Sequence, residues 1–195
     1  MLSELLQKAS LFSLLFRIDL DLAEQVQKNG CQFCRSTLHH ANYPRKPRGG
    51  PVDIPEEYLI RQSLCCANSE CRRRTMPPSS LFMGRRVYWG CVILVVMTLG
   101  QGRLCGASVA KLARMFSISR HTIKRWIIWF RDEFPQTVQW HRLRGRVAST
   151  VSNNKLPGSL VSHFLNYYKS SEKALLDCLA FLARGSTGFI DIFDG

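Results

Sequence analysis

Two short apolar stripes at helical spacing, separated by a polar break, occupy the twenty residues from Leu112 to Arg131. Residues three or four positions apart share one face of a helix, so the stripes predict two short helices joined by a tight turn. We expect Ser108 to cap the first helix, and Ser119 or its neighbour to cap the second. The positions expected at the turn and on the inner face are Ala113, Ser117, Ile118, Ile123 and Trp126. This pattern is typical of a helix-turn-helix, and it constrains the fold more than any other stretch of the chain.

The second helix of this pair carries donors and cations on its other face. These residues are Ser119, Arg120, His121, Thr122, Lys124 and Arg125. A helix that buries one stripe and presents such groups on the other suits the major groove of duplex DNA. The residues expected to contact base edges are Arg120, His121, Lys124 and Arg125. The residues expected to contact phosphates are Lys111, Arg114, Arg131 and Arg142.

The positive charge of the chain is concentrated in one segment. The net charge is +13, from 27 Lys and Arg against 14 Asp and Glu. Residues 72–146 hold 15 of these cations and two acids, Asp132 and Glu133, and the remaining 12 cations and 12 acids cancel. Because the excess charge lies where the helix pair is predicted, we expect a polyanionic partner, duplex DNA rather than a membrane.

Two cysteine pairs separated by a long loop predict a metal site. The expected ligands are Cys31, Cys34, Cys66 and Cys71. Four thiolates turned toward one point are typical of a structural zinc site, which leaves no position for a catalytic water. Cys65 is an alternative to Cys66, because adjacent residues of a strand face opposite ways. His39 and His40 are further alternative ligands.

The remaining thiols and the longest apolar run indicate a buried interior. Cys91, Cys105 and Cys178 lie within apolar helical patterns, so we expect them to be buried and free. The thirteen residues from Val87 to Leu99 are too few for a membrane span and predict a buried helix. The start of the chain lacks the cationic segment and cleavage site of an export signal. We therefore expect a cytoplasmic, nucleoid-associated protein with reduced thiols.

The composition and the residues that start and stop helices predict a mainly α fold with five zones. The zones are an N-terminal amphipathic helix over 1–30, a zinc-ribbon-like module over 31–80, a helix-turn-helix domain over 81–134, a basic linker over 135–157, and C-terminal helices with a frayed tail over 158–195. The first zone is one helix, or two that break near residues 17–19, with Asp21 as a cap. The further helices are expected over 84–99, 108–116, 119–132, 158–168 and 171–183.

Two basic loops accompany the cysteine pairs. Arg72, Arg73 and Arg74 directly follow the last expected ligand, and a metal-pinned loop would hold them in fixed positions for phosphates. The loop over 43–49, YPRKPRG, could contact phosphates or enter a minor groove. Solvated turns are the alternative interpretation of both loops.

Four motifs between residues 31 and 131 carry a likeness to a known family. They are CQFC, CCANSEC followed by RRRTMPPS, GRRVYWG, and SVAKLARMFSISRHTIKRW. In these motifs the chain resembles the small zinc-ribbon plus helix-turn-helix proteins linked to bacterial insertion sequences and transposases. The resemblance implies DNA binding at element ends or promoters through Arg120, Thr122, Lys124 and Arg125, with Cys31, Cys34, Cys66 and Cys71 as zinc ligands.

The resemblance does not extend to a nuclease, so we expect no enzyme. The acids beyond residue 133 are Glu172, Asp177, Asp191 and Asp194, in a stretch too short for a ribonuclease-H-like sheet. The leading hypothesis is a DNA-binding transposition accessory factor or transcription regulator, and the alternative is the DNA-recognition fragment of a split or truncated transposase. Two further hypotheses are a redox or metal-dependent enzyme that uses Cys31 and Cys34, and a peripheral membrane protein that uses the N-terminal amphipathic helix and the basic face. The expected partners are double-stranded DNA, a transposase subunit and a second copy of the chain.

Overall fold

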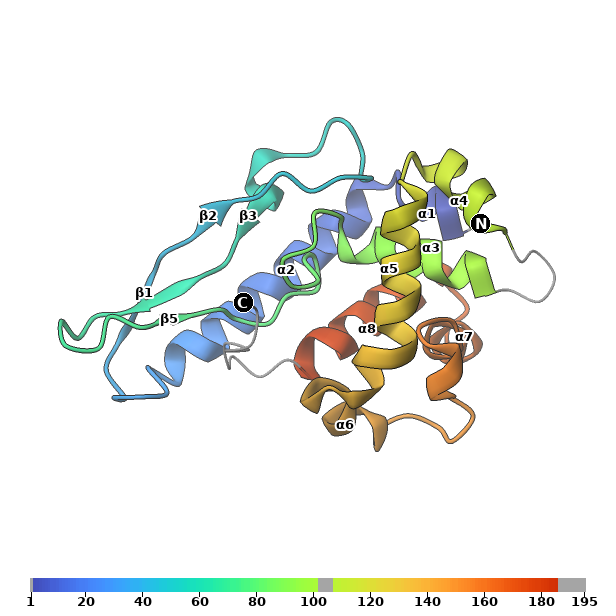
Figure 1. Ribbon diagram of the computed structural model, residues 1–195. Coiled ribbons are helices and arrows are strands. Elements are labelled where there is room, and N and C mark those ends of the chain that lie inside the picture. The colour runs from blue at the N-terminus through green and yellow to red at the C-terminus, as the bar shows by residue number, and fades with distance from the viewer. Residues whose placement is uncertain (1, 102–106, 186–195) are drawn as a thin grey trace.

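The computed structural model describes residues 2–101 and 107–185, and within them the chain is mainly helical with a small sheet, as the sequence predicts (Figure 1). The helices are α1 (Leu2–Leu5), α2 (Ala9–Lys28), α3 (Gly90–Gln101), α4 (Val109–Phe116), α5 (Arg120–Ile128), α6 (Val138–Arg144), α7 (Gly158–Tyr167) and α8 (Ser171–Gly185). Cys105 and most of the expected C-terminal tail lie outside the described residues. Among the helices that are described, none combines the length and the apolar character needed to span a membrane.

The N-terminal segment is two helices, but their break lies at residues 6–8 and not near 17–19. Helix α2 runs through residues 17–19 without interruption, and Asp21, expected as a cap, lies inside it. Its buried stripe consists of Leu11, Phe12, Leu15, Asp19, Leu22 and Ala23. This spacing turns one face of α2 toward the core and leaves Arg17 and Asp21 exposed.

Five short strands follow α2 in the segment over residues 31–80, which we call the cysteine module. They are β1 (Leu38–His40), β2 (Tyr43–Pro44), β3 (Ile60–Arg61), β4 (Leu64–Cys66) and β5 (Arg74–Thr75). Strand β4 pairs antiparallel with β1 and with β5, and β2 pairs with β3. The module has a small apolar cluster of its own, formed by Cys31, Leu38, Leu64 and Cys66. The rest of the apolar core lies among the helices.

Helix α3 occupies the centre of the helical part, where every residue from Gly90 to Met97 is buried. The apolar run is therefore a buried helix, as expected, but the helix begins at Gly90 and not at residue 84. Gly84 instead lies in a turn with φ +61°. At Gly90 an added Cβ would lie 3.2 Å from the Ser80 carbonyl oxygen, so the absence of a side chain lets the incoming segment pass close to the helix.

The segment over 135–157, expected to be a basic linker, contains α6 and contributes to the helical core. Trp140 and Leu143 of α6 are 1% exposed, and Trp140 Nε1 donates to Asn153 Oδ1 at 2.9 Å. The chain reaches α6 from α5 through a π-helical turn, Trp129–Glu133, and a short 3-10 turn. Helices α7 and α8 lie where the sequence predicts them, and α8 packs against α6 and α7. Helix α6 lies below α5 in the view of Figure 1.

Asp19 of α2 joins this helix to the segment that leads from the cysteine module into α3. Its buried carboxylate accepts hydrogen bonds from the N–H (2.6 Å) and hydroxyl (2.8 Å) of Ser80 and from the Ser79 hydroxyl. Burial raises the pKa of Asp19, and these hydrogen bonds and the charge of Arg61 oppose the rise. A buried carboxylate is tolerated where its oxygens are paired, so these contacts fix α2 against the segment.

Candidate functional site

The first cysteine pair is held by a turn that begins where α2 ends. Gly30 follows the helix with φ +71°, and an added Cβ there would lie 3.0 Å from the Arg35 carbonyl oxygen. The Cys31 N–H donates to the Ser36 carbonyl, and the Arg35 N–H donates to the Cys31 carbonyl, both at 2.8 Å. These bonds fold the chain so that Cys31 and Cys34 present their sulfur atoms on one side.

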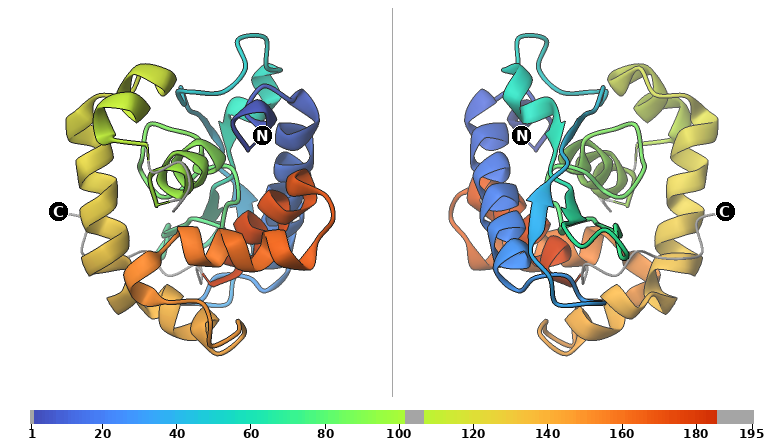
Figure 2. Two further views of the ribbon diagram at one scale, coloured as in Figure 1. Left: turned by 90° about the vertical axis from the view of Figure 1, so that its right-hand side faces the viewer. Right: turned by 90° about the vertical axis from the view of Figure 1, so that its left-hand side faces the viewer.

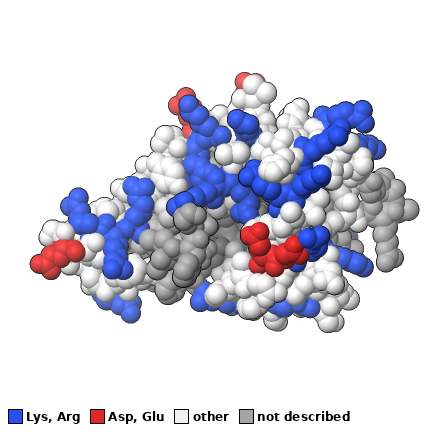
Figure 3. All heavy atoms as spheres, viewed as in Figure 1, with Lys and Arg blue, Asp and Glu red and all other residues white. Residues whose placement is uncertain are grey.

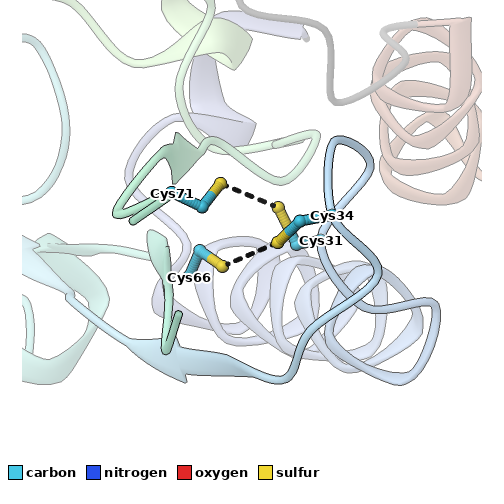
Figure 4. A group of neighbouring side chains, drawn as sticks. All are labelled: Cys31, Cys34, Cys66 and Cys71. Atoms are coloured by element: carbon cyan, nitrogen blue, oxygen red, sulfur yellow. Dashed lines mark hydrogen bonds between the residues drawn. The ribbon is translucent and has the colours of Figure 1, made fainter. Parts of the chain in front are cut away.

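The second pair comes from the end of β4 and the turn that follows it. Cys66 is the last residue of β4, and its N–H donates to the Arg73 carbonyl at 3.0 Å. The turn closes with the Arg72 N–H donating to Asn68 at 2.9 Å. Cys71 lies in this turn, and its sulfur atom points toward that of Cys31 (Figure 4).

The four sulfur atoms converge on one point (Figure 4). Sγ of Cys31 lies 3.8 Å from Sγ of Cys71, Sγ of Cys34 lies 3.4 Å from Sγ of Cys66, and all four atoms lie within 4.8 Å of one another. A tetrahedral ion with metal–sulfur bonds of about 2.3 Å places its ligand atoms about 3.8 Å apart. The cysteines therefore fit a tetrahedral metal ion, as the spacing of the two pairs predicts.

The strand register decides between the alternative ligands. Cys66 pairs with Leu38 and turns into the apolar cluster, whereas Cys65 pairs with His39 and with Arg74 on the other face of the sheet. His39 and His40 are exposed and are not part of the four-sulfur group. The hydroxyl and N–H of Ser36 lower the pKa of the Cys34 thiol to about 6, which favours its thiolate form, whereas burial raises the pKa of the Cys66 thiol to about 12.

Helices α4 and α5 are joined by a tight turn with a cap at each helix start. The Ser108 hydroxyl accepts from the Lys111 N–H at 3.2 Å, and the Ser119 hydroxyl accepts from the Thr122 N–H at 3.1 Å. Between the helices Ser117 adopts the left-handed conformation, φ 52° and ψ 38°, and donates to the Ala113 carbonyl. Both caps and the turn lie where the local sequence predicts them.

One face of α5 is buried and the other is exposed and basic. Ile123 and Trp126 are 0% and 5% exposed. The exposed side chains of its outer face are Ser119, Arg120, His121, Lys124 and Arg125. Thr122 was also expected on this face, but it is half-buried and less exposed than these residues. Its hydroxyl lies 2.8 Å from the Ser119 hydroxyl, so it belongs to the cap. Figure 3 shows Lys and Arg gathered over the first half of α5 and over the segments beside it.

The segment over 84–88 packs along α5 and brings further cations to this surface. Cζ of Arg86 lies 3.9 Å from the Trp129 ring centroid, and the Tyr88 and Trp126 rings meet edge to face at 5.1 Å. Arg45 donates to the Arg86 carbonyl at 2.9 Å, which ties the loop over 43–49 to the same place. Arg86 belongs to the motif GRRVYWG, but its place on this surface could not be predicted from the sequence because it depends on these tertiary contacts.

The cations expected to contact phosphates do not share one environment. Lys111 and Arg114 are exposed on α4, beside α5. Arg131 is paired with Asp132 through two hydrogen bonds of 2.7 Å, and Figure 3 shows acidic side chains at that end of α5. Arg142 is exposed on α6. The basic surface is thus centred on α4 and the first half of α5.

The arginines after the last cysteine lie at the far end of the cysteine module. Arg72, Arg73 and Arg74 are all exposed. Cζ of Arg73 lies 4.1 Å from the Phe33 ring centroid, and Cζ of Arg74 lies 5.8 Å from that of Tyr43.

Comparisons of the chain with family models, with curated proteins and with solved structures found no match.

Proposed function

We propose that this chain binds duplex DNA through a helix-turn-helix formed by α4 and α5. The observation that carries the proposal is the outer face of α5, where Arg120, Lys124 and Arg125 are exposed beside His121 while the opposite face is buried. The major groove of B-DNA admits one α-helix, and Arg and Lys donate there to guanine O6 and N7. No acid occurs between residues 107 and 131, so α4 and α5 themselves carry only positive or neutral side chains.

The proposed contacts divide into reading and anchoring residues. Arg120, His121, Lys124 and Arg125 would reach base edges, because they occupy the outer face near the start of α5. Lys111 and Arg114 would contact the backbone from α4. Contacts to phosphates fix the position of the protein and weaken with salt, whereas contacts to base edges carry the sequence preference.

We infer that the metal ion of the cysteine module is zinc and that its role is structural. Four thiolates in a tetrahedral arrangement are the ligand set of structural zinc sites, and they leave no coordination position for water or substrate. When bound, the ion cross-links the end of α2 to the turn after β4. The residues that would hold it are Cys31, Cys34, Cys66 and Cys71. Arg72, Arg73 and Arg74 follow directly and would add phosphate contacts.

Within DNA binding, we propose a role in a bacterial mobile element, as a transposition accessory factor or a transcription regulator in the cytoplasm at the nucleoid. The motif resemblance supports this narrower role. The alternative, a DNA-recognition fragment of a split transposase, uses the same two sites and differs in requiring a nuclease on another chain. Pairing of two copies would let the protein read two half-sites.

The test is sequence selection from random duplex DNA by the full chain loaded with zinc. The proposal predicts enrichment of one short motif and an affinity for that motif that falls linearly with salt on a double logarithmic plot. A protein that shows no affinity for any duplex at low salt would contradict the proposal. Binding to duplex DNA without enrichment of any motif would agree with DNA binding but contradict the reading of bases by α5.

A further inference from the structure

An aromatic ring is exposed in the turn between the first two cysteines. Phe33 is 45% exposed and belongs to neither of the two apolar clusters. Its neighbours Cys31 and Cys34 turn their sulfur atoms toward the other cysteine pair (Figure 4). A large apolar side chain kept at the surface beside a rigid site is a candidate for contact with a ligand.

Arg73 from the opposite side of the metal site stacks on this ring. Its Cζ lies 4.1 Å from the Phe33 centroid, within the range of a cation–π contact. The contact orders two side chains that would otherwise be mobile, and part of the ring stays accessible beside the guanidinium. Phenyl rings and guanidinium planes are the two surfaces on which proteins stack unpaired nucleobases.

Two further arginines flank the stacked pair in a backbone conformation that favours glycine. Arg35 has φ 63° and Arg72 has φ 46°, and each directly follows the last cysteine of a pair. This conformation is disfavoured for residues that carry a side chain. The three strands and the turns over 31–40 and 64–75 hold four arginines and one acid, Glu70. Figure 3 shows Lys and Arg side chains at this end of the molecule, where β1 and β5 lie in Figure 1.

We propose that the metal-site end of the cysteine module binds single-stranded nucleic acid. An unpaired base stacks on the surface formed by Phe33 and Arg73, and the adjoining phosphates meet Arg35 and Arg72. A base inside a duplex is stacked on its neighbours and offers no free face, so the ring selects an unpaired base. This site is separate from α5 and does not depend on duplex reading by that helix.

The experiment uses the full zinc-loaded chain and two single-stranded probes of equal charge. One is an oligothymidine of about fifteen nucleotides, and the other is an abasic oligonucleotide of the same length, a sugar–phosphate strand without bases. We expect the wild type to bind oligothymidine at least about fivefold more tightly than the abasic strand, because stacking adds to the phosphate contacts. Equal affinity of the wild type for the two probes would overturn the proposal.

The variant Phe33→Ala locates the stacking surface. We expect it to bind oligothymidine about fivefold more weakly while its affinity for the abasic strand changes little, because the substitution removes the ring on which the base stacks. Phe33→Trp should restore the preference for oligothymidine. Tyr43→Leu is the matched control, because Tyr43 also faces an arginine, Arg74, and its loss should leave the preference intact. A zinc content equal to that of the wild type shows that the module is intact.

The outcomes of the two proposals can be told apart. Loss of duplex binding with a retained preference for oligothymidine contradicts only the role of α5. Unchanged oligothymidine binding in Phe33→Ala, with duplex binding intact, contradicts only the single-strand site. Arg35→Gly should weaken both single-stranded probes alike, because it removes a phosphate contact and no stacking surface.

Discussion

The guanidinium of Arg86 lies over the indole ring of Trp129, with Cζ 3.9 Å from the ring centroid. This contact joins the segment that leaves the cysteine module to the helical turn that continues α5. Tyr88, two residues later, meets Trp126 of α5 edge to face. The orientation of the basic helix therefore depends on the segment that follows the metal site, although no cysteine of that site touches α5.

The first prediction concerns removal of the metal. The apolar cluster of the cysteine module is separate from the core of the helices, so we expect a strong chelator to unfold the module and leave most of the helical circular dichroism. Duplex binding should weaken about tenfold or more, because the module anchors the segment beside α5 and the exposed arginines. Retained duplex affinity in the metal-free protein would show that the module does not support α5.

Two adjacent cysteines offer a matched pair of variants for the metal site. Cys66→Ser removes a ligand, and we expect loss of stoichiometric zinc and a large fall in melting temperature. Cys65→Ser should keep one zinc per chain, because Cys65 faces the other side of the sheet with His39 and Arg74. Zinc content measured after gel filtration distinguishes the two, and equal zinc loss in both variants would contradict the observed register.

The division between reading and anchoring residues predicts two different effects on DNA binding. Arg125→Ala should relax the sequence preference at one base pair, at about 1–3 kcal/mol. Arg114→Ala should weaken all duplexes alike and reduce the salt slope by about one. Arg17→Ala is the control, since Arg17 is exposed on α2, and α2 and α5 lie on opposite sides of the molecule (Figure 2). Uniform weakening by Arg125→Ala would remove it from the reading residues.

The helix pair α4–α5 could be predicted because its signals are local. Ser108 and Ser119 cap the helices with hydroxyl groups that reach only three residues ahead, and Ser117 occupies the single left-handed position of the turn. The convergence of the four cysteines could also be predicted, because each pair lies within one turn. The choice of Cys66 over Cys65 could not, since it depends on which face of β4 meets β1.

The parts that sequence analysis missed depend on contacts between distant segments. Helix α6 has only Trp140 and Leu143 as large inward-facing apolar residues among its cations, and α8 completes their burial. An added Cβ at Gly185 would lie 2.5 Å from Leu143, so the two helices approach closely there. The start of α3 was predicted too early because the apolar pattern already begins at Val87. The helix begins at Gly90, where the Ser80 carbonyl passes close to the backbone. The apolar periodicity of a short segment predicts neither the close approach of α6 and α8 nor the passage of the Ser80 carbonyl beside Gly90.

Asp19 should contribute strongly to stability. In Asp19→Ala the buried Ser80 N–H and hydroxyl lose their acceptor, and we expect a loss of about 2–4 kcal/mol in the free energy of unfolding. Asp19→Asn keeps one acceptor oxygen and should lose less. Asp21→Ala, two residues along the same helix and exposed, is the control and should change stability by less than about 0.5 kcal/mol. Chemical denaturation of the three zinc-loaded variants measures the differences.

The turn between α4 and α5 predicts opposite effects for two nearby serines. Ser117 has φ 52°, where glycine is favoured, so Ser117→Gly should raise the free energy of unfolding by about 0.5 kcal/mol. Ser119→Ala removes the hydroxyl that accepts from the Thr122 N–H and should lower it by about 1 kcal/mol. Because Ser119 also begins the basic face, its loss should reduce duplex affinity, whereas Ser117→Gly should leave that affinity unchanged. Denaturation and duplex binding measured on the same samples test both statements, and destabilisation by Ser117→Gly would contradict the left-handed turn.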